Sequence, residues 1–107
     1  MFCIIYKFIV QPVCEDQCRH YWSAVTLWFY QHAGSLGSRL HRASTGKYIA
    51  YAPWQTRAQW EQQRDSSDVE LQTYRQAMRE ACMEIETRSE LEMIDDYLQG
   101  EVYGGGA

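Results

Sequence analysis

The sequence predicts an α+β fold, in which a single four-stranded antiparallel sheet carries its helices on one face. Three observations lead to this prediction. The chain has 107 residues, which is the length of one domain. Strand-like and helix-like patterns follow one another in the order β-α-β-β-α-α-β. Four strands with helices between them pack best as one sheet under a layer of helices.

The first strand and the first helix have the strongest patterns. Residues 1–10 are rich in β-branched and aromatic side chains, which predicts a strand that is covered on both faces and ends before Pro12. Between residues 13 and 33, apolar side chains recur at steps of three and four, which predicts one long helix. Gly34 then lies where a helix commonly ends.

A hairpin is predicted next. Residues 35–43 alternate weakly, residues 47–54 are strongly strand-like, and the Ser-Thr-Gly sequence between them favours a turn. Thr56 and Gln59 have the spacing of a capping box, in which a hydroxyl accepts a hydrogen bond from a backbone N–H three residues later. This spacing predicts a short helix just after the second hairpin strand.

The C-terminal third is predicted to contain a helix and an edge strand. Ser67 and the glutamate three positions later form a second capping box, so a helix is expected over residues 68–83. Its predicted buried stripe consists of Leu71, Tyr74, Met78, Ala81, Cys82 and Ile85. Alternating apolar and acidic side chains predict the last strand over residues 90–98. We therefore expect one ferredoxin-like domain over residues 1–98 and a flexible tail over residues 99–107.

Composition and charge exclude several classes of function. The formal net charge is −4 and there is no basic cluster, so nucleic acid is not an expected partner. No apolar run approaches the roughly 20 residues that span a bilayer, so no membrane association is expected. Cys3, Cys14, Cys18 and Cys82 lie in apolar surroundings, which predicts free thiols and a cytoplasmic location. No metal site is predicted, because Cys14 and Cys18 have no second ligand pair.

Two features predict a homodimer. Helices on one face of the sheet leave the opposite face open, and a second copy related by two-fold symmetry is its simplest cover. The chain also has four tryptophans and eight tyrosines, more than one small core accommodates. The excess aromatic side chains are expected to line a subunit interface or a pocket for a small aromatic or apolar ligand.

Local sequence adds a family resemblance. In the run GSLGSRLHRASTGKYIAYAPWQTRAQW, a glycine ends the first helix, a hairpin follows, and a tryptophan closes the third strand before a capped helix with another aromatic residue. The chain here resembles the antibiotic biosynthesis monooxygenase family of dimeric α+β barrels. Gly34, Trp54, Thr56 and Trp60 occupy the corresponding places. Residues 95–98 also resemble the end of the family's fourth strand, so the resemblance covers nearly the whole chain.

The resemblance implies a dimeric fold that hosts cofactor-free oxygenases, haem-degrading oxygenases and isomerases. Polyketide-type oxygenases of the family place an asparagine where this chain has Ala50. Haem-degrading members place a haem-ligating histidine at Tyr74 and a catalytic tryptophan at about Arg64, and they need an asparagine in the first strand. This chain contains no asparagine. No cofactor is therefore expected, although Tyr74 leaves haem binding open, because tyrosine ligates haem iron in other proteins.

Seven residues are candidates for a functional site. Tyr74 and His41 are the predicted proton-handling groups, and Arg39 is the predicted partner of an anionic substrate. The predicted substrate-binding residues are Trp54, Trp60, Tyr51 and Met78. Each set has a structural alternative. The aromatic side chains suit core packing, and Arg39 and His41 suit a surface or a subunit contact if they face away from the cavity.

Two functions follow from these residues. The first is a monooxygenase that uses neither metal nor flavin and oxidises an electron-rich aromatic, such as a polyketide or quinol, bound as its anion. The second is a non-catalytic ligand-binding or accessory dimer, which the missing asparagine favours. The size of the cavity between the sheet and the helices, and the identity of the polar atoms that point into it, are expected to distinguish the monooxygenase from the accessory dimer.

Overall fold

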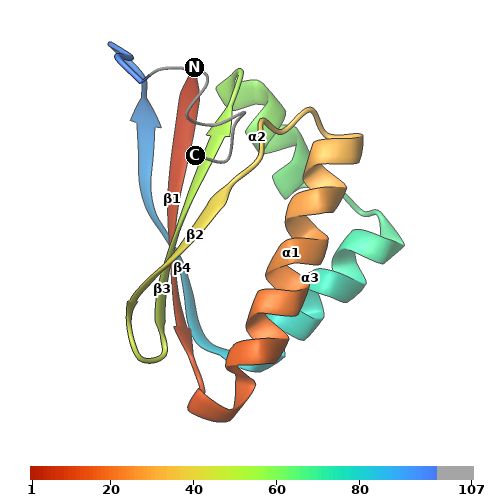
Figure 1. Cartoon of the computed structure of the whole chain (residues 1–107). Coiled ribbons are helices and arrows are strands. Elements are labelled where there is room, and N and C mark those ends of the chain that lie inside the picture. The colour runs from red at the N-terminus through yellow and green to blue at the C-terminus, as the bar shows by residue number, and fades with distance from the viewer. Residues whose placement is uncertain (99–107) are drawn as a thin grey trace.

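The computed structural model describes residues 1–98, and they form the predicted α+β fold (Figure 1). One four-stranded sheet packs against a layer of helices, in the predicted order β-α-β-β-α-α-β. The strands are β1 (Phe2–Val10), β2 (Arg39–Ser44), β3 (Lys47–Trp54) and β4 (Cys82–Glu92). The helices are α1 (Glu15–His32), which follows the 3-10 turn η1 (Pro12–Cys14), α2 (Arg57–Arg64) and α3 (Val69–Ala81). The predicted tail over residues 99–107 lies outside the described residues.

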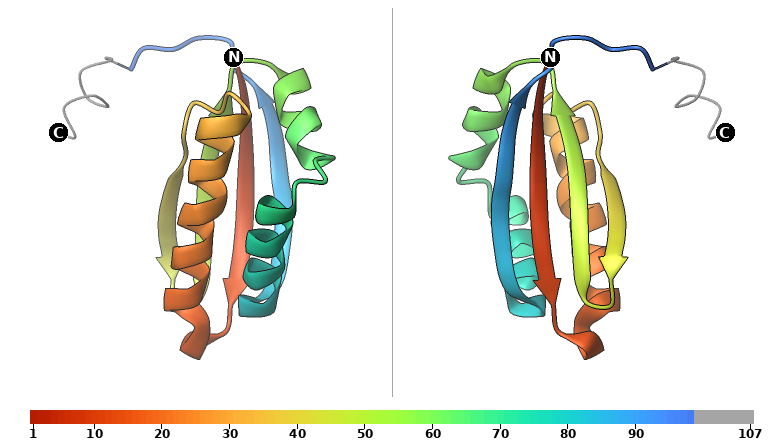
Figure 2. Two further views of the ribbon diagram at one scale, coloured as in Figure 1. Left: turned by 90° about the vertical axis from the view of Figure 1, so that its right-hand side faces the viewer. Right: turned by 90° about the vertical axis from the view of Figure 1, so that its left-hand side faces the viewer.

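Strand β1 lies inside the sheet, whose order is β2-β3-β1-β4 with antiparallel neighbours throughout. Because side chains alternate along a strand, Ile4, Phe8 and Val10 point to the helices, and Ile5 and Lys7 point to the other face. Figure 2 shows α1, α2 and α3 together on one side of the sheet. The apolar run at the N-terminus therefore supplies two different faces, one of which forms the core.

The core lies between β1 and β3 and the helices α1 and α3. Cys18 and Val25 of α1 and Leu71 and Met78 of α3 belong to one buried cluster with Phe8. Cys18 and Leu71 are completely buried. The stripes at three- and four-residue spacing thus bring both helices onto the sheet, as their periodicity predicts.

The face of the sheet away from the helices is partly apolar. It presents Cys3, Ile5, Ile9, Ile49 and Tyr51 from the two inner strands. Lys7 lies on the same face, with its Nζ 3.1 Å from carboxylate oxygens of both Glu84 and Glu86. No described helix covers this face (Figure 2). Within the described part of the chain, no helix has the length and apolar character needed to cross a membrane.

The ends of the helices agree with the sequence at two places and differ at a third. Gly34 follows α1 with φ +74°, a conformation that favours glycine. Thr56 caps α2, accepting a hydrogen bond from the Gln59 backbone N–H at 3.2 Å. The predicted cap at Ser67 is wrong, because the carboxylate of Asp68 accepts from the Leu71 backbone N–H at 3.0 Å. Adjacent serine and aspartate residues are both good caps, and spacing alone does not choose between them.

The predicted start of the last strand is also wrong. Strand β4 begins at Cys82, directly after α3, and takes in just three residues of the segment 90–98. Val10 pairs with Cys82 and Phe8 with Ile85, with a register shift between the two pairs. This bulge turns both Cys82 and Ile85 toward the helices at a three-residue spacing. A bulged strand therefore imitates helical periodicity here, which explains why the sequence predicts too long a helix.

Candidate functional site

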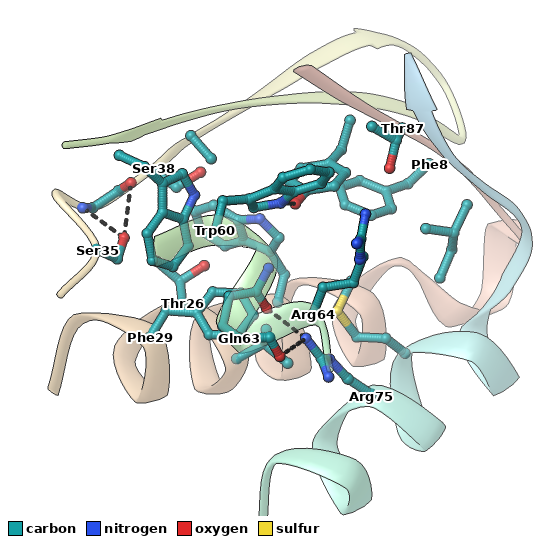
Figure 3. Close-up of a pocket in the computed structure, with 18 of the residues that line it drawn as sticks. Phe8, Thr26, Phe29, Ser35, Ser38, Trp60, Gln63, Arg64, Arg75 and Thr87 are labelled. Atoms are coloured by element: carbon teal, nitrogen blue, oxygen red, sulfur yellow. Dashed lines mark hydrogen bonds between the residues drawn. The ribbon is translucent and has the colours of Figure 1, made fainter. Parts of the chain in front are cut away.

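A cavity of about 530 Å³ lies between the helix-facing side of the sheet and the three helices (Figure 3). This volume is within the range of pockets that hold small organic ligands. Its apolar lining includes Phe8, Val25, Phe29, Ala52, Trp54, Trp60, Met78 and Ile85. Its polar lining includes Tyr6, Thr26, Ser35, Ser38, Gln63, Arg64, Gln72, Arg75, Arg79 and Thr87.

Aromatic side chains from three elements form much of the apolar wall. Phe29 of α1 and Trp54 of β3 have ring centroids 5.7 Å apart. Trp60 of α2 lies 5.7 Å from the ring centroid of Phe2. Trp54 and Trp60 are 1% and 3% exposed, so neighbouring side chains hold both rings in place. Such surfaces suit a flat ligand and exclude water from it.

Tyr6 brings a hydroxyl group into this wall. Its oxygen accepts a hydrogen bond from Nε1 of Trp60 at 2.8 Å, since an indole nitrogen can only donate. The hydroxyl hydrogen itself has no acceptor among residues 1–98, so it is available to a ligand. Burial raises the pKa of Tyr6, which keeps the hydroxyl protonated at neutral pH. Tyr6 is therefore equipped to donate a hydrogen bond or a proton into the cavity.

Trp54 carries a second unused donor. Its Nε1–H is buried and finds no hydrogen-bond acceptor within the described residues. A buried donor without a partner costs about 1–3 kcal/mol.

Positive charge gathers on the helix side of the cavity. Arg64 of α2 and Arg75 and Arg79 of α3 line it, and none of the described residues that line it is an aspartate or glutamate. The Arg64 guanidinium carbon lies 5.1 Å from the ring centroid of Trp60, and that of Arg75 lies 5.6 Å from Phe29. Burial lowers the pKa of Arg75, because removal from water disfavours its charge. The cavity thus combines aromatic walls with hydrogen-bond donors and cations.

The structure brings together three of the seven predicted site residues. Trp54, Trp60 and Met78 line the cavity. Tyr74 lies on α3 outside this lining, where its hydroxyl donates to a carboxylate oxygen of Glu70 at 3.1 Å. That hydrogen bond raises the pKa of Tyr74. The predicted proton-handling role of Tyr74 thus has no support from the geometry of this cavity.

The other three predicted residues lie on the opposite face of the sheet. Arg39 pairs with Tyr51 and His41 pairs with Ile49, at positions that point away from the helices. The sheet itself therefore separates these side chains from the cavity. Their placement agrees with the structural alternative, a surface or subunit contact, and not with a shared pocket.

Sequence reasoning did not identify Tyr6, Gln63 or Arg75. The largely apolar character of β1 hides Tyr6, because it gives no clear period from which to assign the two faces. Arg75 had a detectable signal, since it lies four residues after Leu71 on the inward side of α3. A charged residue at that spacing is a departure from the apolar stripe, and it marks the cavity.

No family model and no curated protein matches the chain. Solved structures do match its fold. Rv0793 from Mycobacterium tuberculosis aligns with a TM-score of 0.71 at 17% identity, covering 91% of this chain and 98% of that one. SnoaB, a cofactor-independent oxygenase from Streptomyces nogalater, aligns with a TM-score of 0.72 at 13% identity, covering 92% and 97%. A structure named antibiotic biosynthesis monooxygenase aligns with a TM-score of 0.70 at 11% identity, covering 89% and 100%.

These similarities concern the architecture. The matched structures span nearly all of this chain and nearly all of their own length, so the whole ferredoxin-like unit is shared. The α+β ferredoxin-like architecture of one chain, implied by the run from Gly34 to Trp60, is thereby confirmed. The chain has the α+β fold of proteins that bear the name antibiotic biosynthesis monooxygenase.

Proposed function

We propose that the chain is a monooxygenase that uses neither a metal nor a flavin and oxidises an electron-rich aromatic compound of the quinol or anthrone type. The observation that carries the proposal is the cavity, which joins aromatic walls to the unused hydroxyl hydrogen of Tyr6. Such a site holds a flat phenol-type substrate away from water with a donor at its reacting end. The name of SnoaB, a cofactor-independent oxygenase of the same fold, supports the proposal.

The proposed reaction needs no cofactor, because an ionised phenol or enol passes an electron directly to dioxygen. For an anthrone, the methylene carbon opposite the carbonyl first loses one proton to water. The resulting anion combines with dioxygen at that carbon, and a peroxide forms there. Tyr6 gives its proton to the peroxide oxygen and regains the one that substrate ionisation released. The carbon then loses its remaining hydrogen together with hydroxide as water. One oxygen atom thus enters the product and the other leaves as water.

Incubation with an anthrone or a quinol under ¹⁸O₂ tests the proposed function. We expect one labelled oxygen atom in each product molecule, formed faster than in buffer alone or with the heat-denatured protein. These two controls are needed because anthrones also oxidise slowly without a catalyst. A rate equal to the controls across a panel of such substrates contradicts the oxygenase.

The alternative is a non-catalytic ligand-binding or accessory dimer. Ala50 favours it, because this buried, apolar residue stands where the polyketide-type oxygenases that the sequence resembles have an asparagine. Native mass spectrometry of the purified protein distinguishes the two. An aromatic ligand that is retained unchanged, together with no incorporation of label, supports the accessory protein.

We further propose that two copies of the chain pair through the open face of the sheet and that the protein works in the cytoplasm. Ile5, Ile9 and Ile49 place apolar surface on that face, and its burial would stabilise a dimer. Arg39 and His41 would then act in the contact between copies. The cytoplasmic location rests on the cysteines, all four of which are free thiols.

A charge on the open face is expected to separate the two copies. The unaltered protein should sediment at twice the 12.6 kDa of one chain at low micromolar concentration. Ile5→Glu should sediment as a single chain, because it buries a carboxylate in an apolar contact without a partner. Val69→Glu is the matched control, since Val69 is 80% exposed on α3, on the other side of the sheet. A single chain for the unaltered protein, or equal dissociation by both variants, contradicts the dimer.

A further inference from the structure

We propose that the ligand of this cavity carries a carboxylate on its aromatic ring system and that Arg75 is the side chain that binds it. The inference deepens the proposed function by naming the substrate class, a flat aromatic carboxylic acid. It rests on that function in one respect: it takes the same cavity as the ligand site. It does not depend on the oxygen chemistry.

Arg75 is a half-buried cation without an anionic partner. No carboxylate of the described residues forms an ion pair with it. Partial removal of an ion from water is unfavourable when no opposite charge compensates. The direction of its pKa shift agrees, since burial is the largest cause and lowers it. A side chain in this state is stabilised by any anion that enters the cavity.

The partners that Arg75 does have leave most of its donors unused. One terminal nitrogen donates to both the backbone oxygen and the side-chain Oε1 of Gln63 (Figure 3). Gln63 is 4% exposed, so it fixes this nitrogen firmly. A guanidinium has five N–H groups, and the three outside that nitrogen have no acceptor among residues 1–98. Each of these three donors can form a charge-assisted hydrogen bond with a carboxylate oxygen.

The surroundings favour an anion over a neutral ligand. Arg64 and Arg79 line the same cavity as Arg75. Among the described residues of the lining, one other side chain is titratable, and it is a tyrosine. That tyrosine, Tyr6, stays neutral at physiological pH because burial raises its pKa. Arg64 is already paired with the exposed carboxylate of Asp65 at 3.7 Å, and Arg79 is exposed to solvent. Arg75 is therefore the cavity cation most in need of a partner. The positive cavity is notable in a chain whose net charge is −4.

The aromatic walls identify the rest of the ligand. The Arg75 guanidinium lies over the ring of Phe29, whose own neighbour is the Trp54 ring. A carboxylate at Arg75 would therefore be attached to a group that lies against these two rings. A flat ring system fits this place.

Isothermal titration calorimetry with a matched pair of probes tests the proposal. We expect 2-naphthoate to bind about 10-fold or more tightly than neutral 2-naphthamide at pH 7.5, since charge-assisted hydrogen bonds exceed neutral ones by about 1.5 kcal/mol. Arg75→Gln should weaken naphthoate binding about 10- to 100-fold and leave naphthamide binding unchanged. Arg19→Gln is the control, because it removes the same charge from an exposed position on α1 outside the cavity.

Several results would overturn the proposal. Equal affinity of the unaltered protein for both probes does so, and this comparison decides the matter even if Arg75→Gln fails to fold. Equal weakening of both probes by Arg75→Gln indicates a structural role, and an equal effect of Arg19→Gln indicates nonspecific attraction. A preference for naphthoate without any ¹⁸O incorporation defeats the oxygenase and leaves this inference standing. Incorporation of ¹⁸O without a preference for naphthoate defeats this inference and leaves the oxygenase standing.

Discussion

Tyr6→Phe is expected to lower the turnover of a quinol or anthrone substrate by about 100-fold, within the range typical of a lost proton donor. The hydroxyl of Tyr6 belongs to the cavity lining, and it has a proton to give and no acceptor of its own among the described residues. Its raised pKa means that it stays a donor through neutral pH, so the loss should be nearly constant between about pH 6 and pH 9. The measurement is kcat for label incorporation from ¹⁸O₂ across that pH range.

The controls separate chemistry from folding. Tyr6→Phe also leaves Nε1 of Trp60 without an acceptor, so a loss of stability of about 1–3 kcal/mol is expected beside the kinetic effect. Rates should therefore be compared at a temperature at which unfolding curves show both proteins to be folded. Tyr30→Phe is the matched control, since Tyr30 is 63% exposed on α1. If Tyr74→Phe abolishes turnover and Tyr6→Phe does not, Tyr74 has the role predicted from the sequence and Tyr6 does not.

The order of elements was predictable because each carries its own local pattern. The stripe of α1, the cap at Thr56 and the hairpin around residues 44–46 all use signals that span a few neighbouring residues. The boundary between α3 and β4 was not predictable in this way. It depends on a bulge, and the bulge exists because Val10 and Phe8 of another strand set the register of Cys82 and Ile85.

The site was less predictable than the fold, because a site depends on which face of each strand meets the helices. Trp54 and Trp60 were found from the resemblance, and Met78 from its helical stripe. Arg39 and His41 share a face with each other, as alternation predicts, yet nothing local says which face that is. The long-range pairing of β2 with β3 turns both away from the cavity. The pairing of β1 with β3 places Tyr6 on the opposite face, toward the cavity.

Leu71→Ala is expected to destabilise the protein by about 2–5 kcal/mol, the usual cost of emptying a buried leucine site. Leu71 is completely buried in the cluster that joins α3 to β1 and α1. Its contribution to the cap of α3 is made through its backbone N–H, which alanine keeps, so the loss reports side-chain packing. The measurement is the free energy of unfolding in urea at one fixed protein concentration, because a dimer makes apparent stability depend on concentration.

The matched control for this variant is Val69→Ala, two residues earlier on the same helix. Val69 is 80% exposed, so its truncation should change the free energy of unfolding by less than about 0.5 kcal/mol. Leu71 does not line the cavity, so the folded fraction of Leu71→Ala should still bind a cavity ligand with nearly unchanged affinity. Leu71 then holds α3 on the sheet, and Arg75, one turn later, faces the cavity. A loss below about 1 kcal/mol would mean that α3 is held by contacts other than this cluster, and the placement of Arg75 would lose its support.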